Sequence, residues 1–157
     1  MIERQPKGGM LREFRRLNVG WNAEPNVPEP RVTLENGDML LSFALNSFVF
    51  NLFSAGERGT LRFTGCSRYL LGGTNDEGWY RGQCRYSKFA PQWGEFYEII
   101  GDDPLRDQST QWVSAAGTGR DRHFLFYLRD ETFECIADEW AIEPREDNPL
   151  CRVIGRR

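Results

Sequence analysis

The chain has 157 residues, of which 39% are hydrophobic and 13% aromatic, and its 20 basic and 23 acidic residues give a formal net charge of −3. This length predicts one domain. Its 11 Phe, 5 Trp and 5 Tyr residues exclude a wholly disordered chain, because each ring that folding buries removes roughly 150–250 Å² from water. The near balance of charge argues against a dedicated nucleic-acid binder, which normally carries a basic excess.

Apolar and polar residues alternate with a period of two along much of the chain, which predicts strands. In chain order we expect them at residues 11–19, 32–35, the apolar run from 39, 60–71, 79–88, 94–100, 123–129 and 133–137. Asn36-Gly37-Asp38 and Asp130-Glu131 predict the tight turns of two hairpins. Helix signals are confined to residues 102–107 and 136–142, where we expect one turn each. The pattern therefore predicts an all-β fold, an antiparallel β-sandwich or β-barrel with little helix.

The two ends of the chain predict how the domain is bounded and where it resides. The first residues, MIERQPKGGMLREFRR, lack the apolar core of a signal peptide, and no apolar run is long enough to cross a bilayer. We therefore expect a bacterial-style cytoplasmic protein without membrane contact. It divides into a flexible N-terminus at residues 1–9, a single β domain at 10–142 and a tail at 143–157, whose Leu150, Val153 and Ile154 can dock on the body.

The stretch GGTNDEG at residues 72–78 is open to three interpretations. It lacks the Gly-Lys-Ser/Thr of a phosphate-binding loop and the carboxylate spacing of a calcium-binding loop, although Asn75, Asp76 and Glu77 could hold a cation. Asn, Asp and Gly favour tight turns, so we expect a hairpin tip between strands 60–71 and 79–88.

This hairpin predicts an arginine cluster on one face of a sheet. If the apolar residues of both strands face the core, then the other face carries Arg62, Arg68, Arg81 and Arg85, with Cys66 and Gln83 among them. The cluster has two interpretations, cross-strand ion pairing with Glu95 and Glu98 or an anion site. Trp79 and Trp93 stand at nearby loop ends, where aromatic rings form either a small core or a ligand cleft.

The cysteines and the single histidine do not form a recognisable catalytic or metal motif. The 4 Cys residues have no C-x-x-C spacing, so we expect small buried side chains rather than a zinc site. His123 stands at the start of a strand beside charged residues, and we expect it to be solvated. We expect neither a cofactor nor a metal.

We therefore expect a non-enzymatic binding domain that engages a protein partner or a small anionic ligand. Its site would consist of Arg62, Arg68, Arg81, Arg85, Trp79 and Trp93. A narrower version is an immunity-type protein that blocks a partner's site. The alternative is a small hydrolase for an anionic or sugar-like substrate, with its active residues among His123, Glu95, Asp76 and Glu77.

A homodimer is a further expectation for the apolar parts of the chain. The contact would use either the segment Met39–Phe53 or the tail Leu150–Ile154. Residues 48–53 are expected to form a strand that is buried on both faces, with a second subunit covering one of them.

Overall fold

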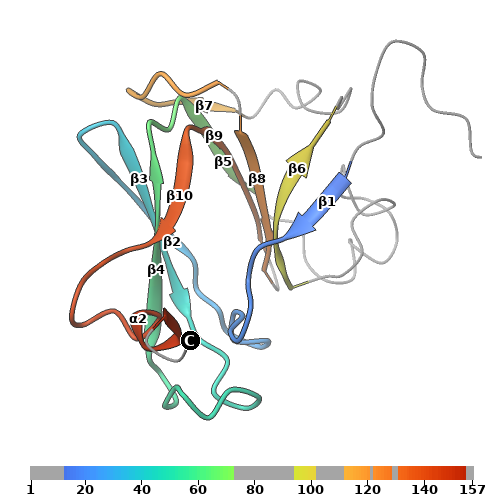
Figure 1. Ribbon diagram of the computed structural model, residues 1–157, viewed down its shortest axis with the longest axis vertical. Coiled ribbons are helices and arrows are strands. Elements are labelled where there is room, and N and C mark those ends of the chain that lie inside the picture. Colours follow the sequence, from blue (N-terminus) through green and yellow to red (C-terminus); the bar gives the residue numbers. More distant parts are fainter. Residues whose placement is uncertain (1–12, 73–93, 102–111, 121, 129–130, 155–157) are drawn as a thin grey trace, which may run out of the picture.

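Two antiparallel sheets face each other in the computed structural model, which describes residues 13–72, 94–101, 112–120, 122–128 and 131–154 (Figure 1). The six-stranded sheet has the order β1 (Glu13–Arg16), β6 (Phe96–Ile100), β8 (Arg122–Tyr127), β9 (Thr132–Ala137), β5 (Arg68–Gly72) and β7 (Val113–Ser114). The four-stranded sheet has the order β10 (Glu139–Ile142), β4 (Arg58–Thr64), β3 (Asp38–Ala44) and β2 (Arg31–Glu35). The only helix in these ranges is the short α2 (Cys151–Ile154). The predicted all-β sandwich is confirmed, and the sheets do not close into a barrel.

Two hairpins predicted from turn residues are confirmed. Strands β2 and β3 pair from Glu35↔Asp38 outward, and the turn between them holds Asn36 and Gly37 at φ of 52° and 86°. These left-handed angles suit Asn and Gly, which explains the turn. Strands β8 and β9 pair from Tyr127↔Thr132 outward.

The predicted single strand at 60–71 is wrong, because the chain changes sheets in its middle. Gly65 has a φ of 67°, a conformation that ends β4 and redirects the chain. Strand β4 pairs with β3 and β10, whereas β5 pairs with β7 and β9 of the other sheet. The residues on either side of Gly65 therefore belong to opposite layers of the sandwich.

Two other predicted elements differ from the structure, and two cannot be compared with it. Residues 136–142 form the end of β9 and all of β10 rather than a turn of helix, and the Asp138 backbone N–H donates to the Thr64 carbonyl over 2.8 Å. Residues 47–53 form turns rather than a strand. The predicted strand at 79–88 and the helical turn at 102–107 lie outside the described residues, as does most of the predicted hairpin tip.

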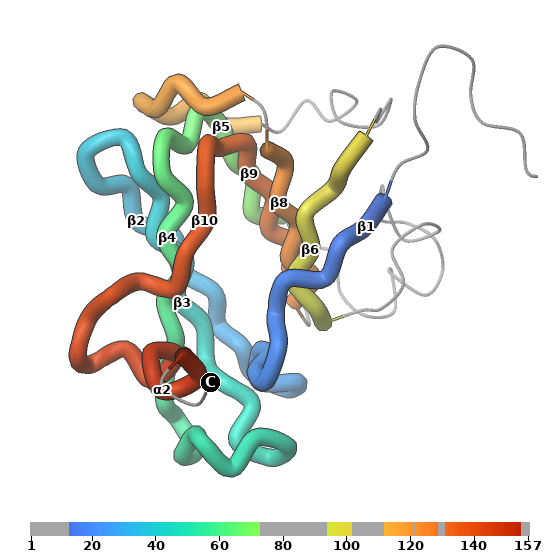
Figure 2. Tube along the Cα trace, in the orientation of Figure 1, coloured from blue at the N-terminus to red at the C-terminus, as the bar shows by residue number. Residues whose placement is uncertain are grey.

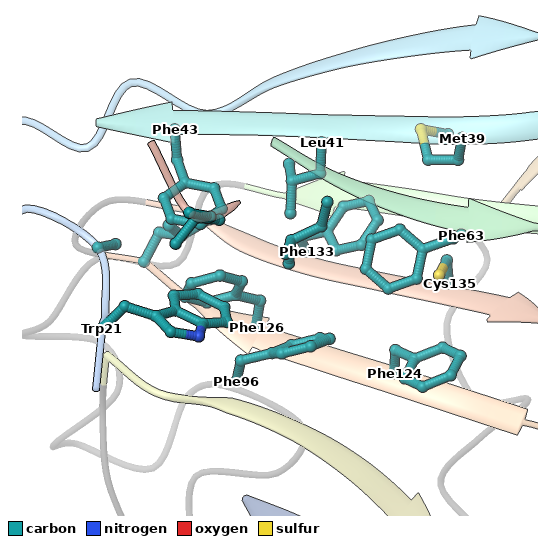
Figure 3. Close-up of a cluster of buried hydrophobic side chains, with 14 of the residues drawn as sticks. Trp21, Met39, Leu41, Phe43, Phe63, Phe96, Phe124, Phe126, Phe133 and Cys135 are labelled. Carbon is teal, nitrogen blue, oxygen red and sulfur yellow. The ribbon is translucent and has the colours of Figure 1, made fainter. Parts of the chain in front are cut away.

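Aromatic rings fill the space between the sheets (Figure 3). Phe43 of β3 meets Phe126 of β8 edge-to-face, with ring centroids 5.0 Å apart. Trp21 stacks on Phe43 at 5.8 Å, and Phe63 of β4 lies 5.4 Å from Phe133 of β9. Contacts of this kind add about 0.5–1.5 kcal/mol each to the free energy gained from apolar burial. The aromatic core therefore joins the two sheets.

The central strands of the six-stranded sheet are buried on their other face as well. In β8, Phe124 and Phe126 belong to the core, and Leu125 and Tyr127, which point the opposite way, are equally inaccessible. Every residue of β9 is buried too. The sequence of a strand that is covered on both faces is typically a continuous apolar run rather than an alternation of apolar and polar residues.

Candidate functional site

Arg62 lies on the outer face of the four-stranded sheet, where three carboxylates bind it. Its guanidinium donates two hydrogen bonds to Glu143, at 2.9 and 2.8 Å, and single ones to Asp38 at 2.7 Å and Glu35 at 2.9 Å. The bidentate geometry with Glu143 is the strong form of an arginine–carboxylate contact. Arg62 thus has the ion-pairing role that was one of the two interpretations, although its partners are not Glu95 and Glu98.

The electrostatics of this cluster agree with a structural role. The hydrogen bonds from Arg62 hold the pKa of Glu143 below its usual value, against the opposing effect of burial. The same bonds, to Glu143 first and then to Glu35, raise the pKa of Arg62. Because three carboxylates surround one guanidinium, the cluster offers no unneutralised positive charge to an anionic ligand.

The prediction that Arg68 shares a face with Arg62 is wrong. Arg68 follows the break at Gly65 and lies on the outer face of the six-stranded sheet, on the opposite side of the sandwich. Its guanidinium carbon lies 4.5 Å from the ring centroid of Trp112, which is the geometry of a cation–π contact. Cys66 was expected among the arginines but is buried in the core.

The remaining predicted site residues are dispersed or lie outside the described residues. The residues outside the described ranges are Arg81, Arg85, Trp79 and Trp93, together with the loop acids Asp76 and Glu77. Glu95 accepts a hydrogen bond from the Asn18 amide at 2.6 Å and lies 3.6 Å from Arg16. Glu98 binds Arg122 through two hydrogen bonds of 2.8 Å. Neither acid is an ion-pair partner of Arg62.

His123 is buried, so the expectation that it is solvated is wrong. Its Nε2 lies 2.8 Å from Oε1 of Glu134, and each side chain has only 3% of its surface exposed. A histidine oriented by a carboxylate is a pairing that general-base catalysis uses, but such a base must also face a substrate. The ring of Trp112 lies 6.0 Å from that of His123, on the same outer face of the six-stranded sheet as Arg68.

The cysteines of the described ranges are free thiols. Cys135 lies in the core, as expected for a small apolar side chain, and Cys66 lies beside it there, whereas Cys151 is half-buried. Burial raises the pKa of Cys135, and a hydrogen bond with Cys135 lowers that of Cys66. In the described part of the chain no three His, Cys, Asp or Glu side chains come together in a group that could hold a metal ion.

Large hydrophobic side chains are exposed at one end of the sandwich, and these were not among the predicted site residues. The exposed fractions are 70% for Val19, 71% for Phe48, 67% for Val49 and 50% for Ile154. Val49 and the sequence neighbours of the other three residues take part in a groove of about 310 Å³, which is lined by Gly20, Val49, Phe50, Asn51, Leu52 and Val153. We call the four exposed side chains together with this groove the apolar end. In Figures 1 and 2 it is the lower end, where the loop between β3 and β4 lies near α2.

A buried asparagine shapes the loop that carries Phe48 and Val49. The side-chain oxygen of Asn46 accepts hydrogen bonds from the backbone N–H groups of Phe48 at 3.0 Å and Val49 at 3.3 Å. Its amide donates to the side-chain oxygen of Asn22 over 2.9 Å. An asparagine that bonds its own backbone two residues ahead stabilises a turn. Here the turn directs Phe48 and Val49 outward, while Phe50 and Phe53 pack on the core.

The tail supplies the other side of the groove. Asn148 binds both the N–H and the carbonyl of Thr60, at 3.1 and 2.9 Å, which fixes the tail to β4. Leu150 is completely buried and packs so closely on Gly59 that a Cβ there would lie 2.6 Å from its Cδ1. This anchoring places α2 at the groove, where Val153 lines it and Ile154 stands exposed beside it.

A sequence signal for this site exists but is weak. Asn46-Ser47 before two large hydrophobic residues is typical of a turn that the asparagine side chain closes. Residues 48–53 are largely apolar, and hydrophobicity alone predicts a strand there. For this reason the prediction for these residues was wrong.

The described residues contain no helix that is long and apolar enough to span a membrane. No known protein family matches the chain, and neither the curated proteins nor the solved structures include a match to it.

Proposed function

We propose that this protein is a non-enzymatic binding domain that engages a protein partner through the apolar end of its sandwich. The observation that carries the proposal concerns Val19, Phe48, Val49 and Ile154, each at least half exposed. Val49 lines one groove, and the other three are the sequence neighbours of residues that line it. Single exposed hydrophobic residues are ordinary on protein surfaces. A contiguous group beside a groove is typical of an interaction site.

The chemistry of the groove favours a protein over a small polar ligand. Pockets for small molecules combine apolar walls with a few convergent polar groups that orient the ligand. Asn51 is the one residue with a polar side chain among those that line this groove. Aromatic residues are instead enriched at protein interfaces, and Phe48 is an aromatic residue with 71% of its surface exposed.

The hydrogen-bonded turn that carries Phe48 and Val49 supports the same function. Ordering a flexible side chain or loop on binding costs about 0.5–1.5 kcal/mol for each side chain that is immobilised. The two hydrogen bonds that Asn46 accepts hold the loop backbone in place before any partner arrives. The turn therefore lowers the entropic cost of association.

The arginine surface contributes to this proposal only in part. Arg62 is neutralised by its three carboxylates, so we do not assign it to a binding site. The contacts predicted for a partner or an anion at Arg81, Arg85, Trp79 and Trp93 remain predictions. The hydrolase, with its active residues among His123, Glu95, Asp76 and Glu77, also remains a prediction. The cytoplasmic location also remains a prediction.

Site-specific photo-crosslinking in cells tests the proposed function. A photoreactive phenylalanine analogue replaces Phe48 in one variant and Val113 in another. Val113 is a matched control because it is also exposed but lies on β7, at the other end of the sandwich (Figure 1). We expect the probe at position 48 to join one discrete protein, identified by mass spectrometry of the adduct, and the adduct to disappear when Val49→Asp is added. Absence of an adduct at position 48, or the same adduct from position 113, would contradict the proposal.

A further inference from the structure

We propose that Arg31 and Arg58 form a second binding site, which takes the phosphate group of a small molecule. The site lies on the outer face of the four-stranded sheet and shares no residue with the apolar end, so it goes beyond the proposed function. It follows from the ion pairs that these two arginines lack, from their meeting at Ser42 and from the repulsion between their charges.

Arg31 and Arg58 differ from most arginines of this protein in lacking a carboxylate partner. Other arginines lie between 2.7 and 3.8 Å from an aspartate or glutamate oxygen, namely Arg15, Arg16, Arg62, Arg122, Arg145 and Arg152. Arg58 donates instead to two uncharged oxygens, the Glu29 carbonyl at 2.7 Å and the Ser42 hydroxyl at 2.9 Å. Within the described ranges no carboxylate forms an ion pair with either arginine.

The acids on this face of the sheet are too distant to neutralise the two arginines. Glu35 and Asp38 lie toward the opposite end of the strands, where they bind Arg62. Arg31 precedes Glu35 by four positions in β2, and Arg58 precedes Arg62 by four positions in β4, which corresponds to about 13 Å along a strand. Exposed charges more than about 8 Å apart are largely screened at physiological ionic strength.

Ser42 brings the two arginines together. Arg31 is directly opposite Ser42 in the β2–β3 pair, a position in which Cβ atoms are roughly 4.5–5.5 Å apart. Arg58 is opposite the small residue Ala44 in the β3–β4 pair and reaches Ser42 through its hydrogen bond. The Ser42 hydroxyl accepts this bond and keeps its own O–H as a donor. Two guanidinium groups and one hydroxyl can therefore donate to the same anion.

The charges of the two arginines act on each other. Burial lowers the pKa of Arg58, and the nearby positive charge of Arg31 lowers it further. The negative charge of Glu29 has the opposite effect, which is the smallest of the three. Two positive charges held close together repel each other, and an anion between them removes this repulsion.

The backbone next to the site is strained. Glu29, whose carbonyl accepts the hydrogen bond from Arg58, has a φ of 44°, a left-handed conformation that is uncommon for residues other than glycine. The neighbouring Pro28 carbonyl accepts a hydrogen bond of 2.8 Å from the Ala44 N–H. Strained residues persist only where the surrounding structure holds them, and they gather at functional sites. Here the strained segment positions the Arg58 guanidinium.

A phosphate group matches the charge and the donors of this site. It carries about −1.5 to −2 charges at pH 7 and three acceptor oxygens. The planar fork of an arginine binds two such oxygens at once. A phosphate group can therefore neutralise both arginines, whereas a single carboxylate carries only one charge.

Isothermal titration calorimetry of the purified full chain with inorganic phosphate tests the site. Sodium chloride keeps the ionic strength equal in every titration, so that general screening stays constant. We expect one phosphate to bind per chain, and Arg31→Met and Arg58→Met each to weaken binding by about tenfold, since each removes a charged donor. Arg15→Met is the matched control, because Arg15 is an exposed arginine of the other sheet, and it should leave the affinity unchanged.

Urea unfolding of the natural chain and of Arg31→Met gives a second readout with a defined sign. Arg31 donates no hydrogen bond to a described residue, and its removal relieves the repulsion. Without phosphate, Arg31→Met should therefore be at least as stable as the natural chain. Phosphate should raise the free energy of unfolding of the natural chain, because it binds only the folded state, and should leave Arg31→Met unchanged.

Three results would overturn this inference. They are a natural chain that does not bind phosphate, an affinity that Arg15→Met lowers as much as Arg31→Met does, and a stabilisation by phosphate that persists in Arg31→Met. None of them bears on the apolar end, since the two sites share no residue.

Discussion

Arg62 brings together three acids that come from distant parts of the chain. Glu35 and Asp38 flank the β2–β3 turn, whereas Glu143 begins the tail. Asp38 also accepts a hydrogen bond of 3.0 Å from the backbone N–H of Gly65, the residue at which the chain changes sheets. One guanidinium thereby holds the first hairpin, the sheet junction and the start of the tail in register.

Removing Arg62 should destabilise the fold. In Arg62→Met the buried carboxylate of Glu143 loses its bidentate partner, and the carboxylate of Asp38 loses one of its hydrogen-bond donors. We expect the free energy of unfolding to fall by about 2–3 kcal/mol, because charged hydrogen bonds of this kind are worth more than neutral ones. Urea unfolding measures the change. The control is Arg15→Met, since Arg15 and Glu13 are exposed and 3.8 Å apart, and such surface pairs contribute about 0–1 kcal/mol.

The same cluster should make stability depend on acid pH. The pKa of Glu143 is lower in the folded chain than its ordinary value, chiefly because Arg62 donates hydrogen bonds to it. A carboxyl group of this kind stabilises the fold above its unfolded pKa and loses that contribution as the pH falls through its folded pKa. The free energy of unfolding should therefore decline below about pH 4.3, the ordinary pKa of glutamate. The decline should be shallower in Arg62→Met, and equal slopes in the two proteins would count against this assignment.

Sequence reasoning at the residue scale placed Arg62 correctly on an outer face but could not identify its partners. The alternation around Leu61 and Phe63 determines which way Arg62 points. Its strongest partner is separated from it by 81 positions, and no local pattern reports a contact of that separation. His123 was placed incorrectly because its charged neighbours in sequence suggested solvent, whereas the sheet face it occupies is buried.

At the scale of elements, the sheet junction at Gly65 depends on close backbone contact with a second glycine segment. The N–H groups of Gly117 and Gly119 donate to the carbonyls of Cys66 and Gly65, each over 2.8 Å. A Cβ on Gly117 would overlap the backbone of Gly65 and Cys66. The structure shows two backbones packed together, which only glycine permits.

Gly117→Ala should therefore destabilise the protein more than an ordinary glycine substitution. The added methyl group meets backbone atoms that cannot rotate away, so we expect a loss of about 3 kcal/mol. The control is Gly56→Ala, because nothing lies within 4 Å of a Cβ at that position. Only the φ of 88° at Gly56 disfavours alanine, and this left-handed conformation should lower the free energy of unfolding by about 1 kcal/mol. Thermal or urea unfolding of both variants gives the difference. Equal losses would show that the close contact at the junction is not a constraint.

The strand breaks show what alternation can predict and what it cannot. Hairpin β2–β3 was predictable because Asn36-Gly37 is a turn signal with a defined backbone geometry. The break at Gly65 was not, since the period of two continues through Thr64 and Cys66 and one glycine inside a strand is compatible with either outcome. That single error placed Arg62 and Arg68 on the same face.

Asn46 should control the presentation of Phe48 and Val49. Asn46→Ala removes the oxygen that accepts from two backbone N–H groups. We expect a loss of about 1–2 kcal/mol in unfolding free energy, together with a lower yield of the adduct from the photoreactive probe at position 48. Urea unfolding measures the first effect, and crosslinking in the Asn46→Ala and natural backgrounds measures the second. An adduct yield that is unaffected by Asn46→Ala would show that the turn does not organise the site.

At the scale of the whole molecule, the apolar end is assembled from three distant segments. Residues 19–20, the loop 48–52 and residues 153–154 of α2 meet only because the core places the loops at one end and Asn148 anchors the tail. The segments Met39–Phe53 and Leu150–Ile154 were each predicted as a possible dimer contact. Their joining into a single surface depends on the fold and not on either segment alone.

The most direct test of the apolar end is the accessibility of the Phe48 ring itself. With 4-fluorophenylalanine at position 48, the change in ¹⁹F chemical shift between H₂O and D₂O reports exposure to solvent. We predict a large shift at position 48, where Phe48 is 71% exposed, and a much smaller one for the same label at the buried Phe43. A small shift in dilute protein, equal to that of the same label at the buried Phe43, would contradict the exposed site.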